Sequence, residues 1–353
     1  MPFGAYLHVP FCRRRCDYCA FATWTDRHHL AERYLAACRT QIEREAAAGL
    51  PEITSAFVGG GTPTQVAPAL LLEVLDALPL AEGAEVTVEC NPDDLTAEMA
   101  AAYAAGGVTR LSIGVQSMVP EVLAALGRDH DPGNVRRAVR AARSAGLAVN
   151  VDLVYGAAGE TLEQWGRTVD AAIELAPDHV SAYALTVEAG TPLAADAVRH
   201  PDDDVQADEY QLATERLGAA GYDWYEISNW ARPGHECRHN LLYWTGGEYL
   251  AIGCAAHGHR GGRRWWNLRT PERYVAAIED GRSPEAGAEE LDADARRVEG
   301  LQLAIRTRGG VPAREVPDGF LAELDGLVEQ VDDRVVLTPE GRLLANEVAI
   351  RLG

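Results

Sequence analysis

Three cysteines near the start of the chain have a spacing that suits a metal–sulfur site. Cys12, Cys16 and Cys19 are separated by three and two residues, and no fourth cysteine follows nearby. A structural zinc site normally uses four ligands, usually as two separated pairs. A four-iron cubane fits three thiolates better, because one of its irons is then open to a small molecule. The spacing therefore predicts a [4Fe-4S] cluster, with zinc or an inert core as the alternative.

The residues between and after these cysteines also suit a cluster. Arg13, Arg14 and Arg15 would offset the negative charge of the thiolates, although a solvated loop would contain the same residues. Tyr18 and Phe21 would shield the cluster, since hydrophobic cover tunes its potential and its contact with water. We therefore expect these five side chains to surround the cluster.

A glycine run in the next part of the chain could hold a cofactor. Gly59, Gly60 and Gly61 let the backbone approach a ligand closely. Bare amides here, together with Thr62, could receive a carboxylate or an amino group. A glycine triplet alone indicates no more than a tight turn, but its position one strand after the cysteines favours a binding site.

Four further polar residues lie at or just beyond the ends of predicted strands. Carboxylates at these positions suit ribose hydroxyls, and an arginine suits a cofactor carboxylate. Each one alone could belong to a surface ion pair. Together they predict a cofactor site built from Glu89, Gln116, Arg128 and Asp152.

Short apolar segments alternate with longer segments of helical periodicity, which predicts parallel strands joined by right-handed crossovers. The expected strands lie at residues 5–10, 56–61, 85–90, 110–117, 148–156 and 179–186. The expected helices lie at residues 27–48, 68–77, 96–105, 132–145 and 161–175. Thr96 and Thr161 are typical N-cap residues for two of these helices.

The candidate residues fall where the strands end, which is the face that carries the active site in parallel β/α barrels. Six strands are too few for the usual eight, so we predict an α/β fold with a partial (β/α)6 barrel. The predicted organisation is a barrel core at residues 1–190, a barrel-completing region at 191–285, and a small C-terminal winged-helix-like α+β domain at 286–353.

The composition argues against several classes of protein. The 353 residues include 53 acidic and 32 basic side chains, and the net charge of -21 would repel nucleic acid over most of the surface. The uncharged run at residues 53–72 has a polar, glycine-rich middle, so we expect no membrane-spanning helix. No secretory signal is recognisable at the start, so we expect a cytoplasmic protein.

The segment YLHVPFCRRRCDYCAF, residues 6–21, resembles the signature of radical S-adenosylmethionine proteins. In that family, S-adenosylmethionine binds the open iron through its amino and carboxylate groups, and an electron from the cluster cleaves its sulfonium. Nearly the whole chain is similar to one subfamily, the oxygen-independent coproporphyrinogen III oxidase group. The similar segments include GGGTPT, ECNPDDLT, RLSIGVQS, LGRDH, NVDLVYG and YEISNWARPG.

This resemblance implies a set of cofactor-binding residues. Those that would contact the S-adenosylmethionine on the cluster are Tyr6, Gly60, Glu89 and His257. Those that match positions of a second S-adenosylmethionine in the oxidase are Gly61, Thr62, Gln116, Arg128, Asp152 and Ala184. We include Tyr18, inside the cysteine motif, among the cofactor-binding residues. Whether a second molecule binds stays open at this point.

Two features differ from the oxidases and resemble the HemW-type haem chaperones instead. Phe21 occupies the position where the oxidases have a further cysteine, and Tyr6 lies close to the start where they have an N-terminal extension. A third feature is the segment HNLLYW, which matches the His-Asn-x-x-Tyr-Trp motif of the chaperone branch through His239, Asn240, Tyr243 and Trp244.

That motif has two interpretations. A neutral imidazole can bind haem iron while aromatic rings cover a porphyrin, so the four residues could bind haem. Equally, Tyr243 and Trp244 could be core residues and His239 could be hydrogen-bonded to backbone. Cys237 is an alternative haem ligand, and Arg263 and Arg264 could pair with haem propionates.

We therefore expect a haem chaperone that carries a [4Fe-4S] cluster and S-adenosylmethionine. Its expected partners are haem and haem-acceptor proteins, in particular membrane-associated respiratory proteins, and not nucleic acid. Two alternatives stay open. One is an oxygen-independent coproporphyrinogen III oxidase that decarboxylates propionates, and the other is a radical enzyme that acts on another substrate.

Overall fold

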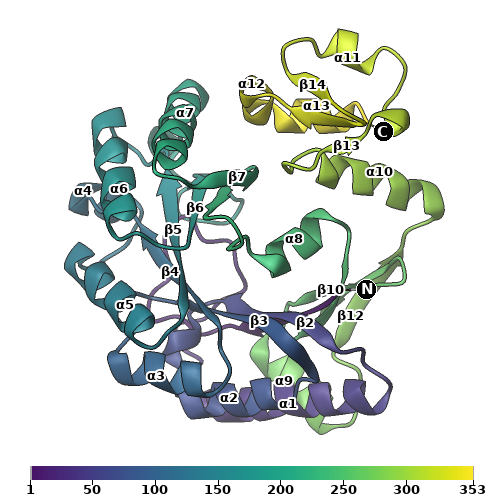
Figure 1. Cartoon of the computed structure of the whole chain (residues 1–353). Coiled ribbons are helices and arrows are strands. Elements are labelled where there is room, and N and C mark those ends of the chain that lie inside the picture. Colours follow the sequence, from purple (N-terminus) through teal and green to yellow (C-terminus); the bar gives the residue numbers. More distant parts are fainter. Residues whose placement is uncertain (1, 353) are drawn as a thin grey trace.

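Six parallel strands form the centre of the sheet (Figure 1). The structure is a computed structural model, and it describes residues 2–352. The six strands are β1 (Phe3–Val9), β2 (Ile53–Gly60), β3 (Leu80–Cys90), β4 (Arg110–Gln116), β5 (Ala148–Tyr155) and β6 (His179–Ala184). Each pairs in parallel with the next along the chain. The six predicted strands and their order are confirmed.

Helices between these strands cover the convex face of the curved sheet (Figure 1). They are α1 (Ala31–Ala47), α2 (Pro68–Asp76), α3 (Ala97–Ala105), α4 (Pro120–Ala125), α5 (Pro132–Ser144) and α6 (Leu162–Glu174). Both predicted N-caps are present: Thr96 accepts the amide of Met99, and Thr161 accepts that of Gln164 in a capping box. Because each crossover contains a helix, all six strands point the same way.

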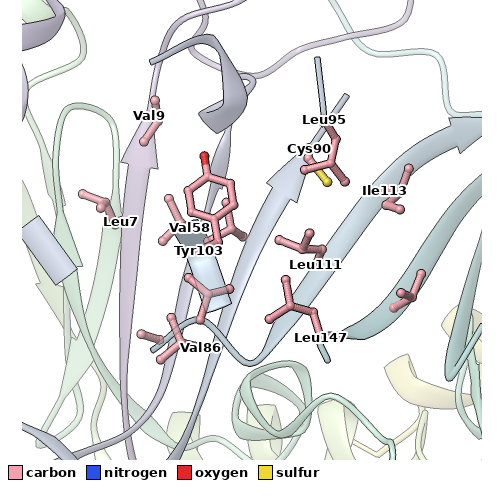
Figure 2. Close-up of a cluster of buried hydrophobic side chains, with 14 of the residues drawn as sticks. Leu7, Val9, Val58, Val86, Cys90, Leu95, Tyr103, Leu111, Ile113 and Leu147 are labelled. Atoms are coloured by element: carbon pink, nitrogen blue, oxygen red, sulfur yellow. The ribbon is translucent and has the colours of Figure 1, made fainter. Parts of the chain in front are cut away.

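The main hydrophobic core lies between the sheet and these helices (Figure 2). Outward-facing side chains such as Val58, Leu111 and Ile113 are fully buried there beside Tyr103 of α3. Side chains alternate between the two faces of a strand. The residues on the concave face are therefore a second, separate set, and many of them are polar.

Further strands extend the sheet on both sides without closing it. Next to β6 lie β8 (Asn229–Ala231) and β7 (Asp223–Glu226), and α7 (Asp203–Ala219) packs on α6. Next to β1 lie β9 (Glu248–Ile252), β10 (His257–Arg260), β11 (Arg263–Asn267) and β12 (Glu285–Glu290), and α9 (Pro271–Glu279) packs on α1. β7 and β12 end the row of twelve strands, as a partial barrel requires.

The short helix α8 (Arg238–Trp244) lies on the concave face (Figure 1). It contacts β1 and β2 and leads from β8 on one side of the sheet to β9 on the other. Gly4 permits this close approach, because a Cβ atom at that position would lie 2.5 Å from Leu242 and 3.1 Å from the ring of His239. The HNLLYW segment is thus held inside the barrel.

The C-terminal part has its own hydrophobic core and a small antiparallel sheet. Its elements are α10 (Ala293–Ala304), β13 (Val311–Pro312), α11 (Phe320–Glu323), β14 (Val328–Val331), β15 (Arg334–Leu337), α12 (Pro339–Leu343) and α13 (Ala345–Ile350). The hairpin β14–β15 and the helices around it form the winged-helix-like α+β unit. The Arg342 guanidinium lies 3.8 Å from the ring centre of Trp224 and joins this unit to β7. The exact domain boundaries stay a prediction.

None of the helices within residues 2–352 combines the length and the hydropathy that crossing a bilayer demands.

We predict that Gly60→Ala destabilises the protein more than Gly49→Ala. Both glycines have positive φ angles, 103° and 91°, so both substitutions strain the backbone by about 1–2 kcal/mol. Only at Gly60 would the new Cβ also collide with a side chain, at 2.2 Å from His8 Nδ1, whereas nothing lies within 4 Å at Gly49. Urea unfolding of the two variants measures the difference. Equal losses of stability would show that the His8 contact imposes no constraint.

Candidate functional site

The ends of the six parallel strands surround a cavity of about 570 Å³. The cysteine loop after β1 contributes Cys12, Cys16, Tyr18 and Cys19 to its wall. The other strands and the segments that follow them contribute Gly60, Gly61, Thr62, Glu89, Gln116, Arg128, Asp152 and Ala184. The structure thus brings twelve of the predicted cluster and cofactor residues to one face, which is the face expected for a parallel β/α barrel.

Two other predicted cofactor residues do not line this cavity. Tyr6 lies deeper in the barrel, and its hydroxyl is 3.0 Å from Nδ1 of His8. His257 is exposed at the start of β10, and its ring centre is 6.0 Å from that of Trp266. A contact between either residue and a cofactor stays a prediction.

The three thiols of the cysteine loop suit a cluster. All three are free, Cys12 is buried, and Cys16 and Cys19 are half-buried. Burial raises the pKa of the Cys12 and Cys19 thiols, so their thiolates need positive charge nearby. Among residues 2–352, no three His, Cys, Asp or Glu side chains are placed to hold a single metal ion. A cubane differs from such a site because each thiolate binds its own iron.

Neighbouring side chains reach two of these sulfurs. Arg128 Nη1 lies 3.5 Å from Cys16 Sγ, and Thr62 Oγ1 lies 3.6 Å from Cys12 Sγ. The guanidinium can therefore offset the negative charge of a thiolate. Tyr18 is half-buried beside these groups. Phe21 is 65% exposed and lines the same cavity as the three cysteines, so its cover of the cluster stays a prediction.

The three arginines of the loop have other partners. Arg13 pairs with Asp93 at 3.3 Å and Arg14 with Asp129 at 3.6 Å. Arg15 donates to the carbonyl of Cys19 from Nε and Nη2. They stabilise the shape of the loop while remaining exposed.

A contact that the sequence analysis missed fixes the middle of the loop. Asp17 Oδ2 accepts from Arg199 at 2.8 Å, and the Asp17 carbonyl accepts the amide of Leu193 at 3.0 Å. Arg199 also donates to the carbonyl of Ala125 at 2.6 Å. The segment that follows β6 therefore clamps the cysteine loop. No local pattern could have revealed a pair separated by 182 residues.

The glycine run is built differently from the expectation. The amides of Gly61 and Thr62 donate to the carbonyls of Val9 and Phe11, at 2.9 and 2.8 Å, and the amide of Gly60 donates to Glu89 Oε2 at 3.1 Å. The expectation of bare amides is thus wrong at these three positions. The run folds back on the cysteine strand, and a Cβ on Gly61 would lie 2.6 Å from the Val9 carbonyl oxygen. The glycines allow this close packing.

Two buried carboxyl groups, Glu89 and Asp152, line the cavity. Burial, together with the nearby charge of Asp152, raises the pKa of Glu89 to about 8. Burial also raises the pKa of Asp152, against hydrogen bonds from Ser112 at 2.8 Å and Asn150 at 2.8 Å. Glu89 is therefore mainly protonated at neutral pH, so it can donate as well as accept a hydrogen bond.

The end of β4 carries backbone strain. Gln116 has a φ angle of 61°, and the β4–β5 register shifts between Gly114 and Gln116. Arg128 Nη2 donates to the Gly114 carbonyl at 2.8 Å. Such conformations often accompany binding sites, because surrounding structure must hold them. Here the strain turns Gln116 toward the cavity that it lines.

A second cavity, of about 150 Å³, lies inside the barrel. We call it the lumen cavity. It shares Glu89, Ser112, Asp152 and Tyr183 with the larger cavity. Its walls also include Tyr6, Phe57, Thr87, Arg110, His239, Asn240 and Tyr243. The predicted haem residues His239, Asn240 and Tyr243 therefore lie next to the predicted cofactor residues.

His239 is buried and has partners for its ring. Its Nδ1 lies 3.1 Å from Ser55 Oγ, and its Nε2 lies 2.9 Å from the Tyr243 hydroxyl. The ring stacks on Phe57 with centres 5.6 Å apart. Burial lowers the pKa of His239 to about 4, so its ring is neutral at pH 7. Neutral imidazole is the form that binds metals.

Glu85 holds the start of α8 in place. Its two carboxylate oxygens accept the amides of His239 and Arg238, at 3.0 and 3.1 Å. A carboxylate at a helix N-terminus satisfies free amides and interacts favourably with the helix dipole. Sequence reasoning missed Glu85. A signal was available, because Glu85 lies four residues before Glu89 on β3 and the alternation of a strand places both on the same face.

The remaining haem candidates occupy different surroundings. Asn240 donates to the Tyr225 hydroxyl and to Glu226, at 3.2 and 2.9 Å, while Trp244 is half-buried at the end of α8. Burial raises the pKa of the Cys237 thiol to about 12, which keeps it protonated. The two arginines considered for haem propionates form ion pairs with glutamates, Arg263 with Glu285 and Arg264 with Glu299.

Comparisons with known proteins identify relatives of this chain. The sequence model of the Radical SAM superfamily matches residues 6–172. The protein named Heme chaperone HemW from Mycobacterium tuberculosis H37Rv is 46% identical, over 98% of this chain and 94% of the relative. HemW proteins from Escherichia coli K12 and Bacillus subtilis 168 are 34% and 32% identical, each over 98% of this chain and 97% of the relative. The chain belongs to the HemW family of radical SAM proteins.

A solved structure confirms the fold. The coproporphyrinogen III oxidase HemN of Escherichia coli, described as a radical SAM enzyme, has a TM-score of 0.87 and covers 99% of this chain and 90% of its own. Its sequence identity is 23%, so this similarity concerns the fold alone. The radical SAM partial barrel predicted from the sequence is thereby confirmed.

We predict that Glu89→Gln reduces the loss of stability that accompanies a rise in pH from about 4.5 to about 8. The folded-state pKa of Glu89 is raised from 4.5 to about 8, so its contribution to stability is complete below pH 4.5 and is lost as the pH rises through about 8. Thermal unfolding from about pH 6 to pH 9 should show a shallower decline in Glu89→Gln than in the wild type.

Two other buried carboxyl groups should still cause part of the decline in stability with pH in the Glu89→Gln variant. Burial raises the pKa of Glu160 to about 7 and that of Glu209 to about 8. The control is Glu163→Gln, which changes an exposed carboxylate on α6 and should leave the wild-type slope. If the slope of stability against pH is also unchanged in Glu89→Gln, Glu89 ionises in the folded protein as freely as in water.

Proposed function

We propose that this protein is a cytoplasmic haem chaperone that binds haem and passes it to acceptor proteins. The observation that carries the proposal is its similarity, over 98% of the chain, to proteins named Heme chaperone HemW. The geometry supports it, because the HNLLYW helix lines the lumen cavity, which adjoins the cavity of the cysteine loop. We further propose that the acceptors are membrane-associated respiratory proteins.

The residues present fit a [4Fe-4S] cluster and S-adenosylmethionine. We propose that Cys12, Cys16 and Cys19 hold the cluster and that S-adenosylmethionine occupies the larger cavity next to it. When bound, the cluster supplies an electron to the sulfonium of S-adenosylmethionine. Arg128 offsets thiolate charge, and Glu89 and Asp152 offer hydrogen-bond acceptors to the cofactor hydroxyls.

The remaining lining residues would enclose that cofactor. We propose that Gly60 and Gly61 let the backbone approach the cofactor closely. We also propose that Gln116 and Ala184 form the opposite wall of the cavity. The larger cavity has a volume of about 570 Å³, within the usual range for small-molecule sites. The number of S-adenosylmethionine molecules bound per chain, measured by titration, distinguishes one occupant of the cavity from two.

Haem binding at His239 requires a change in its hydrogen bonds. Both ring nitrogens already have partners, so iron can bind Nε2 only after the Tyr243 hydroxyl has left it. The lumen cavity of about 150 Å³ is also much smaller than a porphyrin. We propose that α8 moves away from β1 and β2 when haem binds and that Asn240, Tyr243 and Trp244 then contact the porphyrin.

We predict that the cluster depends on the three clustered thiols. Anaerobic reconstitution of the wild type should yield about four iron and four sulfide per chain. The variant Cys12→Ser/Cys16→Ser/Cys19→Ser should retain almost none, because serine hydroxyls remain protonated. Cys38→Ala, which changes a buried thiol of α1, is the control and should keep the full content. Equal iron and sulfide in the triple variant and the wild type would end the proposal.

We predict that haem titration produces a Soret shift that depends on His239. His239→Ala should weaken binding about tenfold or more through loss of an iron ligand. Tyr243→Phe should bind haem more tightly or faster, because it frees Nε2 without removing the aromatic ring. His29→Ala changes an exposed histidine and should have no effect.

The same preparations distinguish the chaperone from the oxidase. Unchanged haem binding in His239→Ala would remove this residue as ligand, and wild-type protein without any Soret shift would remove the chaperone proposal. Reconstituted protein should also leave coproporphyrinogen III unchanged under anaerobic conditions. Repeated turnover to protoporphyrinogen IX would show an oxidase instead.

A further inference from the structure

We propose that the lumen cavity is a binding site for a carboxylate group, which is held by Arg110 and Thr87. Both residues line this cavity on the concave face of the sheet. Neither belongs to the cluster loop, the glycine run or the α8 motif.

Arg110 is a buried charge with an unused donor. Its side chain is 4% exposed, and Nη1 donates to the carbonyl of His235 at 2.9 Å. Nη2 is buried and has no hydrogen-bond partner within residues 2–352, and no carboxylate of that part of the chain lies within 4.0 Å of the guanidinium. Burying a charge is costly unless it is paired and hydrogen-bonded. The guanidinium therefore lacks the anion that such a position normally requires.

The carboxyl groups nearest to the lumen are engaged elsewhere. Glu85 accepts the first amides of α8, and Asp152 accepts from Ser112 and Asn150. Glu89 accepts from Gly60 and is mainly protonated at neutral pH, because burial raises its pKa to about 8. The charge of Arg110 does act on Asp152 from a distance, where it opposes the burial that raises the pKa of this carboxyl. None of the three lies close enough to Arg110 to form an ion pair.

The neutral groups around the guanidinium are also engaged. His179 lies 2.6 Å from Asn150 Oδ1 and 2.7 Å from the Tyr225 hydroxyl, and burial keeps its pKa well below the usual value. A neutral ring adds no charge next to Arg110. Among residues 2–352, Arg110 is thus the one positively charged side chain that lines the lumen cavity.

A second unused donor lies next to Arg110. Thr87 on β3 is directly opposite Arg110 on β4 in the parallel register. Its hydroxyl is fully buried and has no hydrogen-bond partner among the described residues. Paired residues on neighbouring strands point to the same face. A guanidinium N–H and a hydroxyl side by side can donate to the two oxygens of one carboxylate.

The size of the site limits the ligand. A volume of about 150 Å³ admits a carboxylate on a short aliphatic chain but not a porphyrin ring. Phe57 and Tyr243 supply an apolar wall for such a chain. The lumen cavity adjoins the larger cavity, because Glu89, Ser112 and Asp152 line both. The ligand that fits is thus a carboxylate arm in the lumen cavity, with any larger part of its molecule outside it.

Two sources share this chemistry. One is a free short-chain monocarboxylate. The other is a propionate arm of haem, and this second source rests on the proposed function. The experiment uses the full-length protein with three probes: haem, haem dimethyl ester in which both propionates are esterified, and sodium propionate. The variants are Arg110→Gln and Thr87→Val, with Tyr103→Phe as the control, because it removes a buried unpartnered hydroxyl outside the lumen cavity.

If a haem propionate is the ligand, Arg110→Gln should weaken haem binding about tenfold and leave binding of the dimethyl ester unchanged. Thr87→Val should have a smaller effect of the same kind, and Tyr103→Phe none. If a free carboxylate is the ligand, propionate should raise the melting temperature of the wild type but not that of Arg110→Gln. Either result supports the site.

The proposal is overturned if Arg110→Gln and Thr87→Val change neither the preference for haem over its ester nor the response to propionate. Should Arg110→Gln fail to fold, Thr87→Val decides, because its hydroxyl makes no hydrogen bond in this structure. Failure of the proposed function gives a different result from failure of this proposal. In that case the wild type would bind no haem, and the measurements with sodium propionate would still test the carboxylate site.

Discussion

The parallel register of β1 to β6 is the constraint on which the rest of the structure depends. Parallel pairing forces every connection back across the convex face through a helix, so all six strands end at the same edge. The cysteine loop, the glycine run and the ends of β3 to β6 therefore surround one cavity. The clamp between Asp17 and Arg199 then fixes the loop that cannot rely on strand pairing.

The concave face differs from the usual filling of a β/α barrel. Layers of branched apolar residues normally fill a closed barrel, whereas here the lumen contains Thr87, Arg110, Asn150 and His179. Burying these groups costs free energy unless hydrogen bonds replace water. Asn150 and His179 satisfy each other, but Arg110 and Thr87 retain unused donors. The polar lumen therefore indicates a ligand rather than a contribution to stability.

The HNLLYW motif on α8 has a structural role in addition to its proposed role in haem binding. Its residues bind Ser55 on β2, Glu85 on β3 and Glu226 on β7, so the helix joins two central strands to the edge of the sheet. The two interpretations of the motif, core residues and haem site, are thus compatible.

The features that depend on local spacing were predictable from the sequence alone. The Cys12–Cys19 motif, the alternation of strands and helices and the caps at Thr96 and Thr161 could all be read from neighbouring residues, because thiolate spacing, side-chain periodicity and capping act over a few positions. The sequence also placed most of the cavity-lining residues, since parallel strands bring their ends together. Only the tertiary structure decided which distant groups pair. The amides of Gly61 and Thr62 donate to the carbonyls of Val9 and Phe11, and the strand register places Thr87 beside Arg110. Such outcomes depend on burial and on strand register, and both arise from the whole packed sheet rather than from any short segment.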